Sequence, residues 1–147
     1  MEYVISRPYP LPTTTAELNG ALFFNMWGRR YWPYGALEIG DLLIWYYSPG
    51  KAIVWRSRAV DVDRFPYDDK DALKAKIENR FGPFDHAQPY FQEGTESGYC
   101  LAYRVEAQAK IHVPKPESFR FPQLGWMKPD LPEAEEWLAR AKIAPGS

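Results

Sequence analysis

The sequence has few of the residues that build covalent or metal-bound frameworks. It contains one cysteine, Cys100, and two histidines, His86 and His112, in 147 residues. A single cysteine excludes an internal disulfide framework and favours a reducing compartment, so we expect a cytoplasmic protein. The two histidines are far apart in the chain, and no His or Cys cluster has the spacing of a zinc site. We therefore expect no metal and no cofactor.

Long apolar runs and an excess of one charge are also missing. No run of about 18 apolar residues occurs, so no membrane span is predicted. The stretch from Met1 to Pro8 lacks the basic and then apolar segments of a signal peptide. The formal net charge is -1, from 18 Lys and Arg against 19 Asp and Glu. Such a chain does not coat nucleic acid by bulk charge, although a local basic patch remains open.

Aromatic residues and proline, by contrast, are plentiful. Aromatic residues make up 16% of the chain, which has 14 prolines and six tryptophans. Six tryptophans exceed what a core of this size needs, so we expect some of them on a binding surface. Flat rings there commonly stack on a base, a sugar or a methylated group. The length fits a single domain over residues 1–147.

The clearest strand signal is the unbroken apolar run from Leu42 to Tyr47. It lies between a Gly40-Asp41 turn and a Ser48-Pro49-Gly50 turn, and so short a run predicts a strand buried on both faces. A second strand, from Lys51 to Val62, follows the second turn, so the two are expected to pair as a hairpin. The alternation changes along this second strand, which either a bulge near Ser57 or an open end of a barrel would explain.

Further strands and helices follow from periodicity and capping. A strand is predicted at Tyr3–Ser6. The segment Tyr99–Val113, where apolar residues occupy every odd position, predicts one half-buried strand or two that meet at a bend. A short helix is expected from Thr14, where Thr and Glu have capping-box spacing, to Gly20. Longer helices are expected from Asp68 to Arg80, capped by Asp68 or Asp69, and from Pro132 to Lys142.

Three segments have weaker signals. We interpret residues 21–35 as an irregular loop or one helical turn, residues 83–98 as a loop, and residues 119–121 as a short edge strand. Together the elements predict an α+β fold, a small bent β-barrel of five to six strands with peripheral helices. Short strands that bury both faces do so most readily by closing on themselves.

The run from Gly40 to Ser48 resembles the signature of EVE domains, a branch of the PUA-like superfamily. These domains carry Gly-Asp, three apolar residues, an aromatic residue and Tyr-His-Ser at the end of a barrel strand. The segments Tyr3–Pro8 and Pro49–Val54 also resemble the family, whereas Tyr47 replaces its histidine and Trp55 replaces a glycine. ASCH and YTH domains, and PUA-like readers attached to restriction nucleases, share the barrel.

The resemblance implies a PUA-like pseudobarrel that reads RNA or modified DNA, with a flipped base held between aromatic rings. It also implies a nuclease or modification enzyme as a partner class. Trp27 or Trp32 would close over the base, opposite the strand face that carries Tyr46 and Ser48, while Trp45 would be core. The predicted base and phosphate contacts are Asn25, Trp27, Arg29, Arg30, Trp32, Tyr46, Ser48, Arg56 and Arg58.

Two other function classes stay open. A hydrolase acting on nucleosides or RNA would use Asp41, Tyr46 and an arginine as an acid–base set. Asp41, however, follows Gly40 at a turn, where aspartate is expected for backbone reasons, and nothing else gathers catalytic residue types. We therefore expect no enzyme. A protein-interaction module would instead use exposed aromatic residues as its interface.

Overall fold

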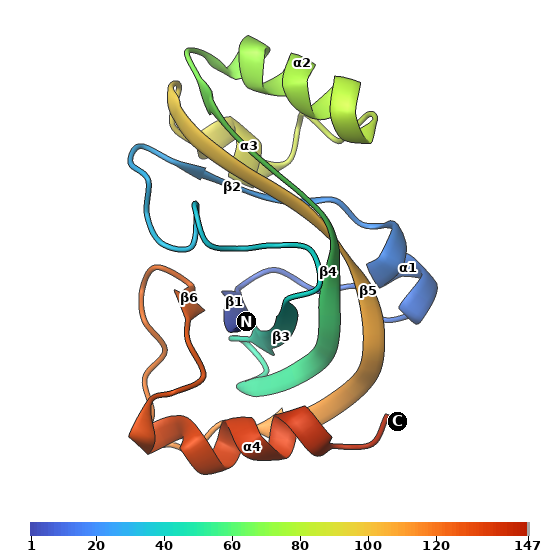
Figure 1. The fold of residues 1–147 in the computed structure, drawn as a ribbon, viewed down its shortest axis with the longest axis vertical. Coiled ribbons are helices and arrows are strands. Elements are labelled where there is room, and N and C mark those ends of the chain that lie inside the picture. Colours follow the sequence, from blue (N-terminus) through green and yellow to red (C-terminus); the bar gives the residue numbers. More distant parts are fainter. Residues whose placement is uncertain (147) are drawn as a thin grey trace. The chain divides into compact units, whose positions relative to one another are not determined.

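The computed structural model describes residues 1–146, which form strands and short helices (Figure 1). The strands are β1 (Glu2–Arg7), β2 (Phe23–Trp27), β3 (Leu42–Tyr47), β4 (Ala52–Tyr67), β5 (Gly98–Pro114) and β6 (Trp126–Met127). The helices are α1 (Thr15–Gly20), α2 (Lys70–Phe81), α3 (Pro89–Glu93), the 3₁₀ helix η1 (Pro132–Ala134) and α4 (Glu135–Ile143). Across the described residues, none of these helices is both long enough and apolar enough to span a bilayer.

The strands are hydrogen-bonded in the order β2-β5-β4-β3-β1-β6. β1 runs parallel to β3 and antiparallel to β6, while β2–β5 and β3–β4 are antiparallel pairs. Six strands in one mixed sheet, with helices outside it, confirm the predicted α+β class and strand number. The β3–β4 hairpin is also confirmed, and of the two possibilities for Tyr99–Val113 the structure has one long strand, β5.

The chain divides into two compact units, which we describe separately. Unit 1 comprises residues 1–21, residues 38–60 and the described residues from Val105 onward. Unit 2 comprises residues 22–37 and 61–104. The long strands β4 and β5 each contribute residues to both units.

Unit 1 is built around β3, whose two faces are both covered. On one face Ile44 and Tyr46 pack in a cluster with Trp137 and Leu138 of α4, the helix below β3 in Figure 1. Trp45, on the other face, is fully buried, and its indole Nε1 donates to the Ser57 hydroxyl at 2.9 Å. An apolar run without alternation therefore produced a doubly buried strand, as predicted.

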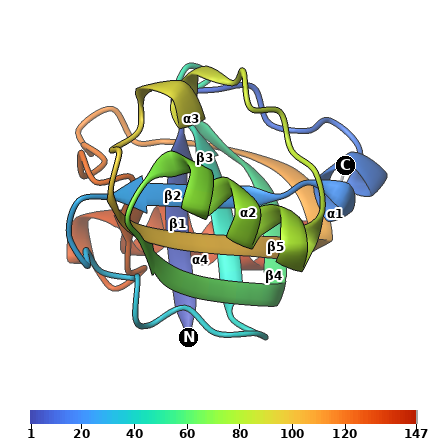
Figure 2. The same cartoon turned by 90° about the horizontal axis from the view of Figure 1, so that it is seen from above.

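Unit 2 packs α2 and α3 against β2, β5 and the second half of β4. Figure 2 shows α2 crossing in front of β2 and β5. Phe24 and Met26 of β2 enter a cluster with Leu73 and Ile77 of α2 and Phe91 of α3. The prediction of an irregular loop over residues 21–35 is therefore wrong for residues 23–27. Their aromatic residues lie on both faces of a strand, which hides its period of two.

Capping residues behave as their chemistry predicts. The Thr14 hydroxyl accepts from the Glu17 backbone N–H at 3.1 Å and donates to the Glu17 carboxylate at 3.0 Å, which confirms that α1 begins after an N-cap at Thr14. Asp69 caps α2 by accepting from the Ala72 N–H at 2.7 Å. Asp69, rather than Asp68, is thus the cap.

Three further predictions, of a loop, an edge strand and a bulge, differ from the structure. Part of the expected loop over residues 83–98 forms α3. The expected edge strand at residues 119–121 is absent among the described elements, and Phe119 is instead buried in the cluster under α4. The strand that pairs with β1 at this edge is β6. The irregularity in the hairpin lies where Trp45 pairs with Trp55 and Tyr46 with Ile53. Ser57 pairs regularly with Leu43.

Candidate nucleic-acid interface

The nine residues predicted to contact nucleic acid are divided between the two units. Those in unit 2 are Asn25, Trp27, Arg29, Arg30 and Trp32, whereas those in unit 1 are Tyr46, Ser48, Arg56 and Arg58. Each group is therefore described within its own unit. The single pocket that would combine them stays a prediction.

In unit 2, one face of the β2–β5 pair carries both a polar side chain and rings. Phe24 and Met26 point into the helix-covered core, so Asn25 and Trp27 lie on the opposite face. The antiparallel register pairs Trp27 with Tyr99, and paired residues share a face. Trp27 and Tyr99 therefore lie on the side of the pair that faces away from α2 and α3, whereas the Asn25 amide donates to the Tyr90 hydroxyl of α3 at 3.5 Å.

The loop after β2 places an arginine and a tyrosine against Tyr99. The guanidinium carbon of Arg30 lies 5.2 Å from the centre of the Tyr99 ring, within the range of a cation–π contact. Tyr34 meets the same ring edge-on, with ring centres 5.4 Å apart and planes at 71°. Arg30 and Tyr34 thus both pack against the Tyr99 ring.

This loop is held in place by Arg64 of β4. Its Nε donates to the Tyr34 backbone oxygen at 2.6 Å, and its second guanidinium arm donates to the Leu37 backbone oxygen. Burial raises the pKa of Tyr34, against the opposing effect of the Arg30 and Arg64 charges. The Tyr34 phenol therefore remains protonated near neutral pH and can donate a hydrogen bond.

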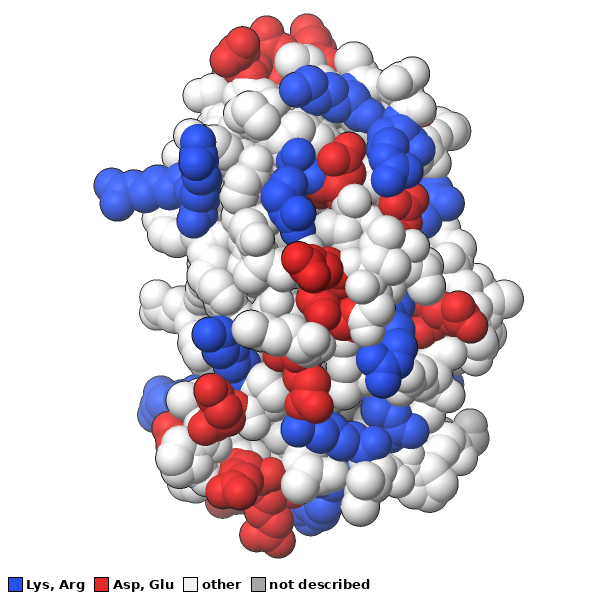
Figure 3. All heavy atoms as spheres, viewed as in Figure 1, with Lys and Arg blue, Asp and Glu red and all other residues white. Residues whose placement is uncertain are grey.

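The solvent-facing part of the loop combines two cations with rings. Arg29, Arg30 and Tyr31 are exposed, and Trp32 is half-buried. Within residues 1–146 neither Arg29 nor Arg30 forms an ion pair. Viewed as in Figure 1, Figure 3 shows basic side chains projecting at the left edge, at the level of the loop that follows β2. We call Arg29, Arg30, Tyr31, Trp32 and Tyr99 the arginine–aromatic surface.

Trp27 differs from its predicted position. It is the last residue of β2 rather than part of the following loop, and its ring is buried, with the Tyr31 ring edge-on at 6.4 Å. The strand end is fixed by a close approach to Gly98, which has φ +153°. A Cβ there would lie 2.1 Å from the Trp27 backbone oxygen, so the pairing of Trp27 with Tyr99 requires glycine at 98.

In unit 1, Tyr46 is part of the packed core. Its ring lies parallel to that of Phe121, with centres 5.4 Å apart, and edge-on to Trp137 at 5.5 Å. Burial raises the pKa of the Tyr46 phenol. Tyr46 and Trp45 are thus both buried, one on each face of β3, because helix and sheet cover both faces.

The other candidate residues of unit 1 bind backbone oxygens. One nitrogen of Arg56 donates to the oxygens of Ala141 and Ala144, both at 2.9 Å, at the C-terminal end of α4. Arg58 donates to the Gly40 oxygen at 2.8 Å. The Ser48 hydroxyl donates to a backbone oxygen of β1 at 3.5 Å. Arg56 therefore caps a helix, where its charge also matches the helix dipole.

Four residues at the unit 2 site were not predicted from the sequence, namely Tyr31, Tyr34, Arg64 and Tyr99. The alternating pattern of β5 marks Tyr99 as a strand residue but does not show which strand is its neighbour. The pairing with Trp27 joins segments 72 positions apart. The one local signal was the density of aromatic and basic residues between positions 21 and 35, which did identify the segment.

Metal chemistry finds no support in the part of the chain that the structure describes. No group of three or more His, Cys, Asp or Glu side chains there could hold a metal ion. Cys100 is buried in the unit 2 core, and burial raises the pKa of its thiol. It is a small core residue.

Comparison with solved structures identifies the fold. ASCH from Zymomonas mobilis superposes with a TM-score of 0.53 at 17% identity, covering 94% of this chain and 93% of that one. A tyrosine-to-phenylalanine mutant of that protein gives 0.54 at 18% identity, over 94% and 96% of the two chains. A serine-to-alanine mutant gives 0.54 at 19% identity, over 94% of each.

Sequence comparison alone finds no relative. No family model matches the chain, and no curated protein matches it. The structural match agrees, at the level of the fold, with the barrel that the resemblance implied, and the matching structures are ASCH domains. The chain therefore has the small α+β, barrel-like fold of ASCH domains.

Proposed function

We propose that the chain is a nucleic-acid-binding module and that its arginine–aromatic surface contacts the strand. The observation that carries this proposal is the pair of exposed guanidiniums, Arg29 and Arg30, next to Tyr31, Trp32 and Tyr99. Guanidiniums bind phosphate oxygens, and neighbouring rings stack on bases whatever their sequence. The PUA-like fold adds support, because domains of this superfamily often bind RNA.

The charge distribution fits contact through a small surface rather than a broad one. The net charge is -1, and on the face shown in Figure 3 acidic and basic side chains are interspersed. Long-range attraction of a polyanion is therefore weak. Affinity must come from a few phosphate contacts combined with stacking, so binding to unmodified duplex is expected in the non-specific range of about 10⁻⁴ to 10⁻⁶ M.

Reading of a modified base, such as a methylated one, is the finer form of the proposal. An unstacked base would lie on the exposed ring of Tyr31 and the half-buried ring of Trp32, with polar groups such as the protonated Tyr34 phenol available to its edge. A methyl group adds apolar contact with such rings. Asn25 and Trp27 are both buried, so in this proposal they support the surface rather than contact the base.

The hydrolase alternative is the weaker proposal. The Asp41 carboxylate accepts from the Met1 amino group at 2.8 Å and from the Glu38 backbone N–H at 2.8 Å. The Tyr46 phenol is enclosed by Phe121 and Trp137. Both groups of the suggested acid–base set thus already contribute to local structure, which favours a binding role.

The test is fluorescence anisotropy with single-stranded RNA and DNA of one sequence, unmodified and methylated, over a series of salt concentrations. Each arginine that no longer binds a phosphate should reduce the salt slope by about 0.7 for single strands. The double variant Arg29→Ala/Arg30→Ala should therefore bind more weakly and with a shallower slope. Arg140→Ala, an exposed arginine on α4 in unit 1, is the matched control.

Two outcomes would count against this proposal. Equal decreases in affinity per removed charge for the Arg29→Ala/Arg30→Ala variant and for Arg140→Ala would show that only net charge matters. Unchanged binding in the double variant would remove the surface from the interface. Equal affinity for methylated and unmodified strands would leave nucleic-acid binding standing and contradict modified-base reading alone.

A further inference from the structure

The loop that follows β2, residues 28–37, is shaped by hydrogen bonds of its own. The Tyr34 N–H donates to the Tyr31 oxygen at 2.8 Å. The Leu37 N–H donates to the Pro33 oxygen at 3.2 Å. Each of these bonds joins two residues of the loop. They therefore set its local shape but do not attach it to the sheet.

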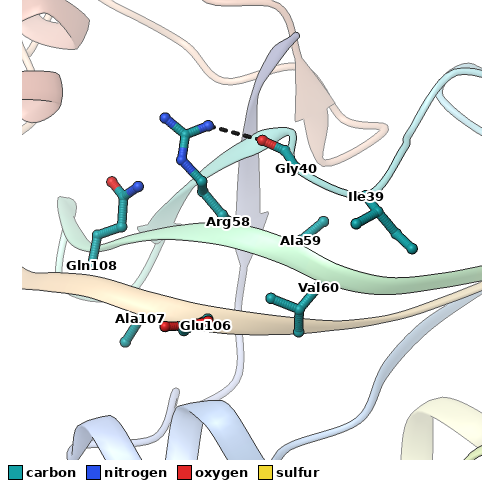
Figure 4. Close-up of a pocket in the computed structure, with 8 residues that line it drawn as sticks. All are labelled: Ile39, Gly40, Arg58, Ala59, Val60, Glu106, Ala107 and Gln108. Atoms are coloured by element: carbon teal, nitrogen blue, oxygen red, sulfur yellow. Dashed lines mark hydrogen bonds between the residues drawn. The ribbon is translucent and has the colours of Figure 1, made fainter.

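The attachment comes from one side chain, Arg64 of β4. Its Nε donates to the Tyr34 oxygen at 2.6 Å, and its second guanidinium arm donates to the Leu37 oxygen. The planar fork of an arginine holds two acceptors at a fixed separation, which a single donor cannot do. By comparison, Arg58, which lines a hollow in unit 1 (Figure 4), donates from one nitrogen to the Gly40 oxygen at 2.8 Å.

The part of the loop that Arg64 holds is next to the ring on which Arg30 lies. The Tyr34 ring meets the Tyr99 ring edge-on, and the Arg30 guanidinium carbon lies 5.2 Å from the centre of that same ring. Tyr99 is itself fixed by its pairing with Trp27 in the β2–β5 ladder, and all five residues belong to unit 2. A loop that moved away from the sheet would therefore take both Tyr34 and Arg30 off this ring.

We propose that Arg64 is the positioning residue of the arginine–aromatic surface, an inference that rests on the proposed function. It keeps the loop in its binding arrangement before a strand arrives, and it contacts no nucleotide itself. Its donors are directed at the Tyr34 and Leu37 oxygens. Without them, a strand has to order the loop as it binds, and the cost of that ordering is subtracted from the affinity.

The test is fluorescence anisotropy with an unmodified single strand, on Arg64→Met and Arg64→Lys. Methionine loses both bonds, so binding should be about tenfold weaker, which is the cost of ordering one or two side chains on contact. Lysine keeps the charge but, as a compact single ammonium, does not hold both oxygens as the fork does. Arg64→Lys should therefore also bind more weakly than wild type, by about threefold, at unchanged net charge.

Arg104→Met is the matched control. Arg104 is also a half-buried arginine of unit 2, and it donates to the Phe81 backbone oxygen at 2.6 Å, at the C-terminal end of α2. Its loss should lower the melting temperature, as Arg64→Met does, but leave the affinity unchanged. Thermal melting checks that each variant folds, and Arg64→Lys keeps the test decisive if Arg64→Met does not.

Two further readouts separate positioning from direct contact and from general destabilisation. In a double-mutant cycle, the loss of affinity on Arg64→Met should be at least about threefold smaller in the Arg30→Ala background, because part of the effect passes through Arg30. In the free protein, the NMR signal of the Arg30 Nε–H, identified by its loss in Arg30→Ala, is sensitive to the Tyr99 ring beside it. This signal should move toward that of a free arginine in Arg64→Met and stay in place in Arg104→Met.

Several results would overturn the inference. Wild-type affinity in Arg64→Lys, with weak binding in Arg64→Met, would show that only charge matters. Equal losses on Arg64→Met with and without Arg30 would make Arg64 an independent contact. An unmoved Arg30 signal in Arg64→Met would show that the loop keeps its place. Failure of the proposed function is distinguishable, because Arg29→Ala/Arg30→Ala would then bind as tightly as wild type, which removes the surface and this role with it.

Discussion

Arg56 in unit 1 and Arg30 in unit 2 are both arginines near aromatic residues, yet the fold uses them in opposite ways. The Arg56 guanidinium donates to two backbone oxygens at the end of α4. The Arg30 guanidinium lies over the Tyr99 ring, and no carboxylate of residues 1–146 pairs with it. One side chain stabilises a helix end, whereas the other keeps its donors available for a ligand.

This contrast indicates where binding capacity is found in the molecule. In unit 1 the candidate residues are used by the protein itself: Tyr46 packs under α4, and Arg58 holds the Gly40 oxygen. In unit 2, by contrast, Arg29 and Arg30 are exposed on a loop anchored by Arg64. Changes in unit 1 should therefore alter stability, and changes at the arginine–aromatic surface should alter affinity.

The largest effect is expected for Trp45→Ala in unit 1. Trp45 is fully buried and donates to the Ser57 hydroxyl, so its removal leaves a large cavity and should cost about 3–5 kcal/mol in the free energy of unfolding. Denaturant unfolding measures it. Trp32→Ala, a half-buried tryptophan of the unit 2 loop, is the matched control and should lose less stability but more affinity. A larger loss of stability in Trp32→Ala, together with a larger loss of affinity in Trp45→Ala, would contradict the contrast between the two units.

Gly98→Ala should be the most damaging small change in unit 2. The added Cβ would lie 2.1 Å from the Trp27 backbone oxygen, which forces β2 and β5 apart where Trp27 pairs with Tyr99. We expect a decrease in stability of about 1–3 kcal/mol, together with weaker nucleic-acid binding. Gly35→Ala is the control, because a Cβ there meets no atom within 4 Å. Equal melting temperatures for the two variants would contradict this account of the strand end.

Arg56→Met should destabilise unit 1 without changing affinity. Methionine keeps much of the aliphatic stem but loses both hydrogen bonds to α4, which is worth about 1.5–3 kcal/mol for bonds from a charged group. Unfolding and anisotropy on the same sample separate the two effects. A variant with normal stability but a reduced salt slope would restore Arg56 to the nucleic-acid interface.

The elements that could be predicted are those with local signals. The apolar run of β3 lies between two turns, the alternation of β5 persists over many residues, and Thr14 and Asp69 have capping partners three positions away. Each signal involves neighbours in sequence. The fold class follows from these elements, because a buried strand, a hairpin and a long half-buried strand require a curved sheet.

The remainder depends on contacts between distant segments. β2 was missed because Phe23 and Trp27 lie on the face opposite Phe24, so the period is hidden by rings on both sides. The role of Tyr99 depends on its register with Trp27, and that of Arg56 on its contact with α4. The sequence alone does not show whether an arginine already donates its hydrogen bonds to backbone oxygens of the same chain.

The smallest effect on stability, and the largest on binding, is expected at the arginine–aromatic surface. Arg29 and Arg30 are exposed, so replacing both by alanine should change the free energy of unfolding by no more than about 0.5 kcal/mol per site. Tyr31→Ala should remove a stacking ring, which is worth about 1–3 kcal/mol of binding per base. Denaturant unfolding and anisotropy, measured on each variant, check both expectations.

The most direct test of the central claim is the salt dependence of single-stranded oligonucleotide binding, compared between Arg29→Ala/Arg30→Ala and Arg56→Met. We predict that the slope of the unit 2 double variant is smaller by about 1.4, which is about 0.7 for each of two phosphate contacts, at unchanged melting temperature. We predict that the unit 1 variant keeps the wild-type slope at a lower melting temperature. A wild-type slope in the double variant, with a reduced slope in Arg56→Met, would contradict the account.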